Sequence, residues 1–137
     1  MDKIFSVVKD VLTKEEIHFD LNEANDVFSF GFKTDAGIVR VKLVIDEEKE
    51  WFVVVGNFPN NIPVKFVDKL YPIFNKLNRA SLFTSWLVDP NDGEVQLRWG
   101  ATVDEGAINE EMVKVAMYGV VQNINSECEN IMKEIYA

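Results

Sequence analysis

The stretch that decides the fold is residues 38–55, which reads IVRVKLVIDEEKEWFVVV. In its first eight residues every second side chain, from Val39 to Ile45, is apolar, and the positions between them include Arg40 and Lys42. This period of two is typical of a β-strand with one buried and one solvated face. After a charged turn, residues 51–55 are apolar on both faces, which predicts a strand that is covered on both sides or lies at an interface. The stretch therefore predicts two consecutive strands of a meander.

Toward the N-terminus the sequence predicts one helix and two further strands. The helix is indicated by apolar residues at helical spacing, namely Ile4, Phe5, Val8, Val11 and Leu12. Alternation then predicts strands at Ile17–Leu21 and Phe28–Phe32. The tripeptide Asp35-Ala36-Gly37 predicts the hairpin that leads into residue 38.

Toward the C-terminus, residues 57–63 break the strand pattern and predict the start of a helix. Asn61 suits the N-cap position of this helix, and Pro63 suits its first turn. Pro72 lies inside the helical pattern, and the sequence leaves open whether it kinks the helix or divides it. The remaining elements are two strands and a long helix with an Asn cap, predicted at Leu82–Val88, Val95–Val103 and Asn109–Ile135.

The predicted order of elements is α-β-β-β-β-α-β-β-α. Runs of strands joined by tight turns indicate an antiparallel sheet with helices packed on it, which is the α+β class. No stretch has the composition of a linker between domains, and no repeat is present. Residues 1–137 are therefore predicted to form a single domain.

Composition and charge exclude several classes of protein. The chain has 137 residues, 47% of them hydrophobic, and a formal net charge of -9. The apolar content argues against disorder, and the negative charge argues against a nucleic-acid partner. Apolar runs are far shorter than the roughly 20 residues of a membrane helix, and the first residues lack a secretory signal pattern. We therefore expect a cytoplasmic protein that binds neither nucleic acid nor membranes.

No pattern in the sequence predicts catalysis, a metal or a cofactor. His18, the only histidine, alternates outward on a predicted strand, and Cys128 lies on an apolar helix stripe between two glutamates that disfavour a thiolate. The carboxylate clusters at 46–50, 89–94 and 104–105 are interpreted as solvated turns, because they lack the spacing of a calcium loop. The scattered glycines form no phosphate-binding loop. We expect a protein that is not an enzyme.

Four neighbouring segments of the chain carry a family resemblance. They are the helix that begins near Pro63, the run Ile73–Asn78 (IFNKLN), the strand Phe83–Asp89 and the hairpin Asp92–Arg98. This pattern resembles the YbjN family, and as a topology the resemblance covers nearly the whole chain. It implies the fold of type III secretion chaperones and a sensory-transduction-regulator type of protein without an established reaction. It also implies relatives that are small, acidic, cytoplasmic homodimers holding an extended segment of a secreted protein.

The aromatic residues are too numerous to be assigned to one small core. Trp51 and Trp86 stand opposite the strand faces assigned to the core, and with Val53 and Val55 they would form an apolar patch if exposed. Such a patch is the usual mark of a protein interface. The sequence leaves open whether this surplus is core, dimer seam or binding surface.

The most specific polar group is Asn75, Asn78 and Arg79 at the end of the middle helix. These residues either cap the helix and anchor the next strand, or donate hydrogen bonds to a bound peptide. The candidate binding residues are thus Trp51, Val53, Asn75, Asn78, Arg79 and Trp86. The leading hypothesis is a non-enzymatic, homodimeric, chaperone-like adaptor that binds an extended or amphipathic protein segment. The alternative is a sensory domain that binds a small ligand or lipid.

Overall fold

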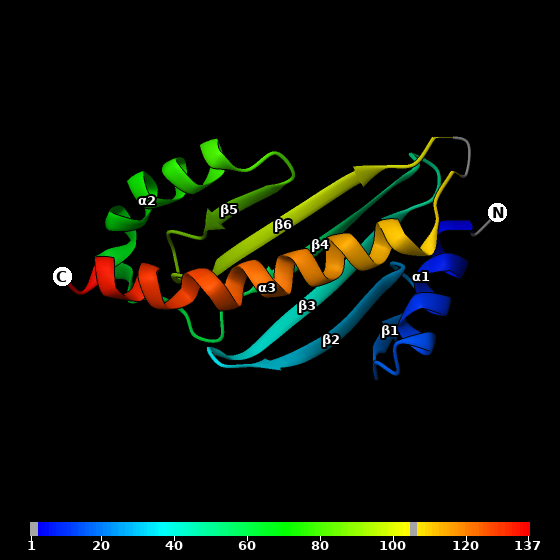
Figure 1. Ribbon diagram of the computed structural model, residues 1–137, viewed down its shortest axis with the longest axis horizontal. Helices are drawn as coiled ribbons and strands as arrows, with labels where there is room; N and C mark the ends of the chain where they lie inside the picture. Colours follow the sequence, from blue (N-terminus) through cyan, green and yellow to red (C-terminus); the bar gives the residue numbers. More distant parts are fainter. Residues whose placement is uncertain (1–2, 105–106) are drawn as a thin grey trace.

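The computed structural model describes residues 3–104 and 107–137, in which three α-helices and a six-stranded sheet occur (Figure 1). In chain order the elements are α1 (Lys3–Lys14), β1 (Asp20–Asn22), β2 (Val27–Thr34), β3 (Gly37–Asp46), β4 (Trp51–Asn57), the 3-10 helix η1 (Val64–Phe66), α2 (Val67–Ala80), β5 (Thr84–Val88), β6 (Val95–Thr102) and α3 (Glu110–Ile135). The strands lie in the order β1-β2-β3-β4-β6-β5, and every neighbouring pair is antiparallel. The predicted α+β class and order of elements are confirmed.

The three α-helices pack on one face of the sheet, and the other face is bare (Figure 1). β3 shows the two environments most clearly. Val39, Val41 and Leu43 are fully buried under the helices, whereas Arg40 and Lys42 are exposed. We call the covered side the inner face and the bare side the outer face. The prediction that this strand has one solvated face is confirmed.

α3 crosses the inner face at very short range, and two glycines make this possible. A Cβ atom on Gly56 of β4 would lie 2.5 Å from Val120 Cγ1 and 2.7 Å from Ile124 Cδ1. On the helix side, a Cβ on Gly119 would lie 2.7 Å from Cζ3 of Trp99 in β6. Gly119 looks unfavourable as a helix residue, but it lets the indole ring of Trp99 lie against the helix backbone.

The start of α1 is held by a side chain from the turn between β3 and β4. The Glu47 carboxylate accepts hydrogen bonds from the backbone N–H groups of Ile4 at 3.0 Å and Phe5 at 2.8 Å. The first N–H groups of a helix have no partner within the helix, and a negative charge there is favourable. Glu47 therefore ties α1 to the sheet.

The middle helix begins later than predicted. α2 starts at Val67 after the 3-10 turn η1, so the prediction of Asn61 as helix N-cap is wrong. The side-chain amide of Asn61 donates instead to Asp92 O at 3.3 Å, and Ile62 N donates to Gly93 O at 2.8 Å. These bonds hold the segment against the β5–β6 turn, and the helix begins only after it.

Pro72 does not divide α2, which is continuous from Val67 to Ala80. Proline in a helix interior costs about 3 kcal/mol, because it lacks a backbone donor. Tertiary packing offsets this cost, since Leu70 and Phe74 are buried on either side of Pro72. Packing against the core thus keeps α2 continuous through Pro72.

Two strands are shorter than predicted. β1 begins at Asp20 rather than Ile17, and β5 begins at Thr84 rather than Leu82. Before β5, Ser81 Oγ lies 2.6 Å from Thr84 Oγ1 and accepts from Thr84 N at 3.1 Å. This local turn keeps Leu82 out of the sheet. The helix cap at Asn109 is confirmed, because its Oδ1 accepts from Met112 N at 3.0 Å.

We predict that Gly56→Ala lowers the free energy of unfolding by about 1–3 kcal/mol, the usual cost of overpacking a core. The added methyl group must push α3 away from β4. Gly100→Ala is the matched control, because a Cβ there meets nothing within 4 Å and the residue lies on the outer face. Urea denaturation of both variants checks this prediction, and equal midpoints would contradict it.

Candidate functional site

β6 is longer than its neighbour β5, and this mismatch leaves part of a strand edge open. β5 pairs with β6 from Val95 to Trp99, whereas β4 pairs with β6 as far as Thr102. On the side of β6 away from β4, β5 is the only neighbouring strand in the described part of the chain. Residues 100–102 therefore have no strand beside them on that side.

The backbone groups of Gly100 and Thr102 point to this open side. Successive residues of an antiparallel strand direct their N–H and C=O groups to opposite neighbours. Val103 N donates to Glu50 O at 2.7 Å, beside the start of β4, so Val103 faces β4. Gly100 and Thr102 lie an odd number of residues away and face the opposite direction. An edge of this kind can pair with another extended segment.

An apolar groove with a volume of about 550 Å³ runs along the open edge, between β6 and the first half of α3. The residues that line it are Phe83, Trp99, Gly100, Ala101, Thr102, Asn109, Glu111, Met112 and Val115. Phe83 and Val115 are 63% and 45% exposed, so apolar surface is accessible to a partner. We call this site the β6–α3 groove.

A stack of two aromatic rings closes one end of the groove. The rings of Phe83 and Trp99 are 5.3 Å apart and nearly parallel, at 8°. A second hollow of about 340 Å³ lies between α2, β5 and α3 and is lined by the same two rings, together with Leu77 and Asn123 among others. The stacked pair is therefore a wall shared by two neighbouring hollows.

The charges at both hollows are negative. Glu111 lines the β6–α3 groove and Glu127 lines the second hollow, and no Lys or Arg of the described residues lines either. Complementary charge across an interface raises specificity and the rate of association. A segment with Lys or Arg beside its apolar residues matches this site.

The structure places Trp86 in the core, so the prediction that it points outward is wrong. Trp86 is 5% exposed and lies on the inner face of β5. Its ring stacks on Phe74 of α2 at 5.6 Å and meets Phe58 edge-on at 5.7 Å. The indole ring thus joins α2 to the sheet, and it lines the second hollow but not the β6–α3 groove.

Asn78 anchors the edge strand β5. Its Oδ1 accepts from Trp86 N at 2.7 Å, and its Nδ2 donates to Trp86 O at 3.2 Å. The side chain therefore satisfies both backbone groups of Trp86, as a neighbouring strand would, and blocks this edge. Asn75 and Arg79 are exposed on α2, and their role in binding stays a prediction.

Trp51 and Val53 lie on the outer face of β4, as predicted, and both are half-buried. They are not brought together with the β6–α3 groove, which lies on the inner side of the sheet. The prediction therefore missed the groove residues Ala101, Met112 and Val115. A signal existed in the sequence, since the predicted strand Val95–Val103 is longer than the strand Leu82–Val88.

The residues considered for catalysis are not assembled into a site. His18 is exposed, and burial raises the pKa of the Cys128 thiol above its ordinary value, which disfavours the reactive thiolate. Within residues 3–104 and 107–137 no cluster of three or more His, Cys, Asp or Glu side chains could hold a metal ion. Of the cluster at 104–105, Glu105 lies outside the described residues. No helix of the described chain is long and apolar enough to span a membrane.

Comparison with known proteins gives matches in structure only. No family model and no curated protein matches the sequence. Three solved structures are similar along most of the chain. The ExsC-ExsE complex matches with a TM-score of 0.70 at 14% identity, over 92% of this chain and 91% of that chain. YbjN from E. coli matches with a TM-score of 0.68 at 11% identity, over 92% of both chains.

The third structure is the HopA1-SchA chaperone-effector complex, with a TM-score of 0.62 at 14% identity over 92% of this chain and 94% of that chain. The chain has the YbjN-like fold of type III secretion chaperones. The resemblance found in the sequence is confirmed at the level of the fold.

We predict that Asn78→Ala lowers the free energy of unfolding by about 1–3 kcal/mol, because it leaves the N–H and C=O of Trp86 without their partner. The matched control is Asn75→Ala on the exposed side of the same helix, for which we expect a change within about 0.5 kcal/mol. Thermal and urea denaturation measure both effects. If the two variants were equally stable, Asn78 would not anchor β5.

Proposed function

We propose that this protein is a non-enzymatic, chaperone-like adaptor that holds an extended segment of another protein in the β6–α3 groove. One observation carries the proposal: residues 100–102 of β6 have no strand beside them on the side away from β4, and they lie directly beside the apolar groove. An extended segment placed there pairs its backbone with β6 and inserts alternate side chains between Phe83, Met112 and Val115. Backbone pairing supplies affinity for many sequences, and the groove selects apolar side chains.

The comparisons support this proposal without deciding it. Two of the similar structures are complexes with a second protein, ExsC-ExsE and the HopA1-SchA chaperone-effector complex. The negative rim at Glu111 and Glu127 favours a segment with basic residues beside its apolar ones. A cytoplasmic location agrees with the expectation from composition and belongs to the same proposal.

The proposal also includes a homodimer. Leu82 is 90% exposed and stands next to Phe83 at the corner between α2 and β5. Large apolar side chains exposed to this degree at neighbouring positions are typical of protein interfaces. A dimer formed at this corner would bring the grooves of the two copies close together. The second candidate function, binding of a small ligand, is favoured by the groove volume of about 550 Å³, which is in the range of ligand sites.

We predict that Val115→Asp weakens binding of an extended peptide by about tenfold or more, because a carboxylate replaces an apolar contact in the groove. The probe is a twelve-residue peptide selected on the wild-type protein from a random phage library. Val64→Asp is the matched control, since Val64 is also exposed but lies on η1 away from the groove. Equal affinities for both variants would contradict the proposal.

Hydrogen exchange of the same complex distinguishes strand pairing from simple insertion of side chains. We expect the amides of Gly100 and Thr102 to exchange fast in the free protein and slowly with the peptide bound. An unchanged exchange rate at both amides in the saturated complex would exclude pairing with β6.

We predict that the wild-type protein is a dimer in native mass spectrometry and that Leu82→Asp converts it to a monomer of 15.7 kDa. The physical reason is that a carboxylate at the seam loses apolar burial and meets its own copy across a two-fold axis. The Val64→Asp control stays dimeric. A wild-type monomer contradicts the dimer, and a fixed small mass carried by the protein supports the ligand-binding alternative instead.

A further inference from the structure

The outer face of the sheet has a charge opposite to that of the whole protein. Its strand positions, read from the pairing register, include four cations, Lys33, Arg40, Lys42 and Arg98, and two acids, Asp20 and Asp46. The full chain has 14 Lys and Arg against 23 Asp and Glu. At the strand positions of this face, cations therefore outnumber acids, and three of the four cations, Lys33, Arg40 and Lys42, lie on β2 and β3.

These cations are available to a partner. None of the four takes part in an ion pair among the described residues. Arg98 donates to the side-chain oxygen of Gln96, at 3.2 and 3.3 Å, which orients its guanidinium group. Asp89 and Glu94 line a hollow together with Arg98, so this cation has two carboxylates near it, whereas Arg40 and Lys42 line a depression that contains the single carboxylate of Asp20. Asp46 accepts from Lys49 N at 2.9 Å and so is occupied by its own turn.

Apolar side chains lie between the charges. Val27, Val44 and Val53 occupy one row across β2, β3 and β4. In the next row Val55 stands between Lys42 and Arg98. Neighbouring strands are spaced about 4.8 Å apart, so the backbones of Lys42 and Arg98 are about 10 Å from each other, with Val55 between them. Charged and apolar groups thus alternate across the face.

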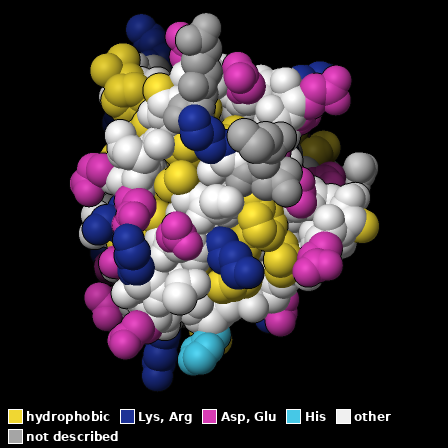
Figure 2. Space-filling view, turned by 90° about the vertical axis from the view of Figure 1, so that its right-hand side faces the viewer, with side chains coloured by type: hydrophobic (Ala, Val, Ile, Leu, Met, Phe, Trp, Pro, Cys, Tyr) yellow, Lys and Arg dark blue, Asp and Glu magenta, His cyan; other side chains and the backbone are white. Residues whose placement is uncertain are grey.

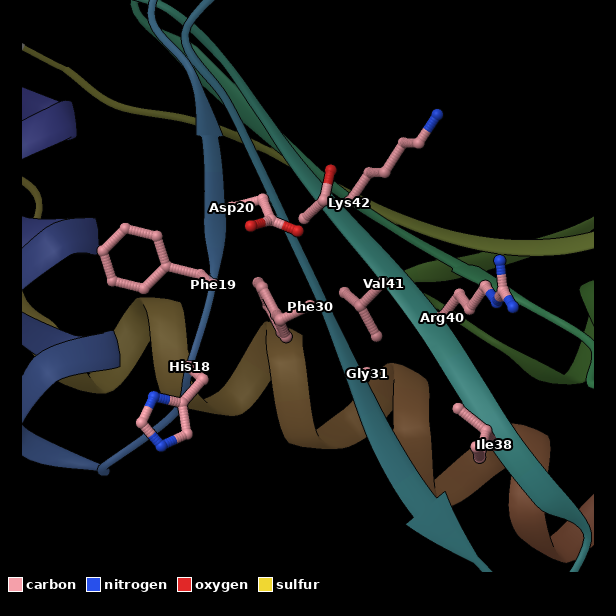
Figure 3. A pocket seen from close by; sticks show the side chains of 10 residues that line it. His18, Phe19, Asp20, Phe30, Gly31, Ile38, Arg40, Val41 and Lys42 are labelled. Carbon is pink, nitrogen blue, oxygen red and sulfur yellow. The ribbon is translucent and has the colours of Figure 1, made fainter.

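The face is hollowed where Gly31 of β2 has no side chain. A depression of about 490 Å³ is lined there by His18, Asp20, Ile38, Arg40 and Lys42 among others. Figure 3 shows that Arg40 and Lys42 project from β3 to the same side of the sheet, away from α3. The end of the molecule near α1 differs, since acidic and basic side chains are interspersed there with small hydrophobic patches (Figure 2).

The charges select among the occupants that could cover this face. A second copy of the chain related by a two-fold axis would set this patch against itself, so the cations would repel one another. Nucleic acid would meet a protein with a net charge of -9 and only four cations on the face. A protein segment with carboxylates flanking apolar side chains would attract the cations of this face, and its apolar side chains would match the valines between them.

We propose that the outer face docks an acidic, amphipathic segment of a partner protein, with carboxylates on Arg40, Lys42 and Arg98 and apolar side chains on Val53 and Val55. This surface goes beyond the proposed function, because it lies on the side of the sheet opposite the β6–α3 groove. The outer face favours an acidic segment, whereas the groove favours a basic one. The molecule then has two docking surfaces, one for a basic segment and one for an acidic segment.

The test uses a fluorescein-labelled peptide of twelve residues in which Glu and Leu alternate, measured by fluorescence anisotropy. We expect saturable binding that weakens steeply with added salt. The double variant Arg40→Glu/Lys42→Glu should bind at least tenfold more weakly. The double variant Lys9→Glu/Lys76→Glu, which makes the same change in net charge on exposed positions of α1 and α2, should bind as the wild type does.

Two further measurements distinguish binding at the outer face from binding in the β6–α3 groove. Val115→Asp in the groove should leave binding of the acidic peptide unchanged, and loss of binding in this variant would locate the peptide in the groove and overturn the proposal. A peptide in which Lys replaces Glu should not compete. Equal weakening by the two double variants would show a general charge effect and would also overturn it.

Discussion

The structure depends on how closely α3 lies against the sheet. Gly56 removes the side chain that would hold the helix away from β4, and Gly119 makes the corresponding room for the ring of Trp99. With α3 held at this distance, its long apolar stripe covers the centre of the inner face. α1 and α2 pack at the two sides of α3 (Figure 1). All helical cover is thereby used on one face, and the other face remains open to partners.

The edges of the sheet differ in how well they are protected from pairing with another strand. At β5 the amide of Asn78 occupies the backbone of Trp86, and at the opposite edge β1 has only three residues. Both devices are known to protect sheet edges from unwanted pairing. The far end of β6 lacks such protection, and so do residues 30–34 of β2, which extend beyond the end of β1. The β6 stretch is regarded as the site because the apolar β6–α3 groove lies beside it.

The sequence predicts well what local alternation determines. In residues 38–45 one face is wholly apolar and the other carries Arg40 and Lys42, and this assignment of the inner and outer faces is confirmed. Residues 82–88 do not separate, because Phe83 and Leu87 are on one side of the alternation while Trp86 is on the other. Thr84 lies on the same face of β5 as Trp86, and it is buried there with its hydroxyl group next to that of Ser81. Alternation alone therefore does not show which side of this strand faces the core.

The unequal lengths of the two predicted strands are a sequence signal for an open edge, but the groove beside that edge depends on how the strands pair and could not be predicted. The groove exists where β5 stops and β6 continues, and the boundary of β5 is set by the turn at Ser81. Met112 and Val115 become groove residues only through the angle at which α3 crosses β6. Neither the pairing register nor the crossing angle is encoded in a short pattern of residues.

The open stretch of β6 is only three residues long, about 10 Å of extended chain. Affinity differences among related complexes arise mostly from the dissociation rate, and so short an edge offers few contacts to slow it. A segment bound there would therefore have a short residence time. Such lability suits a carrier that hands its cargo on, and it is poorly suited to permanent storage.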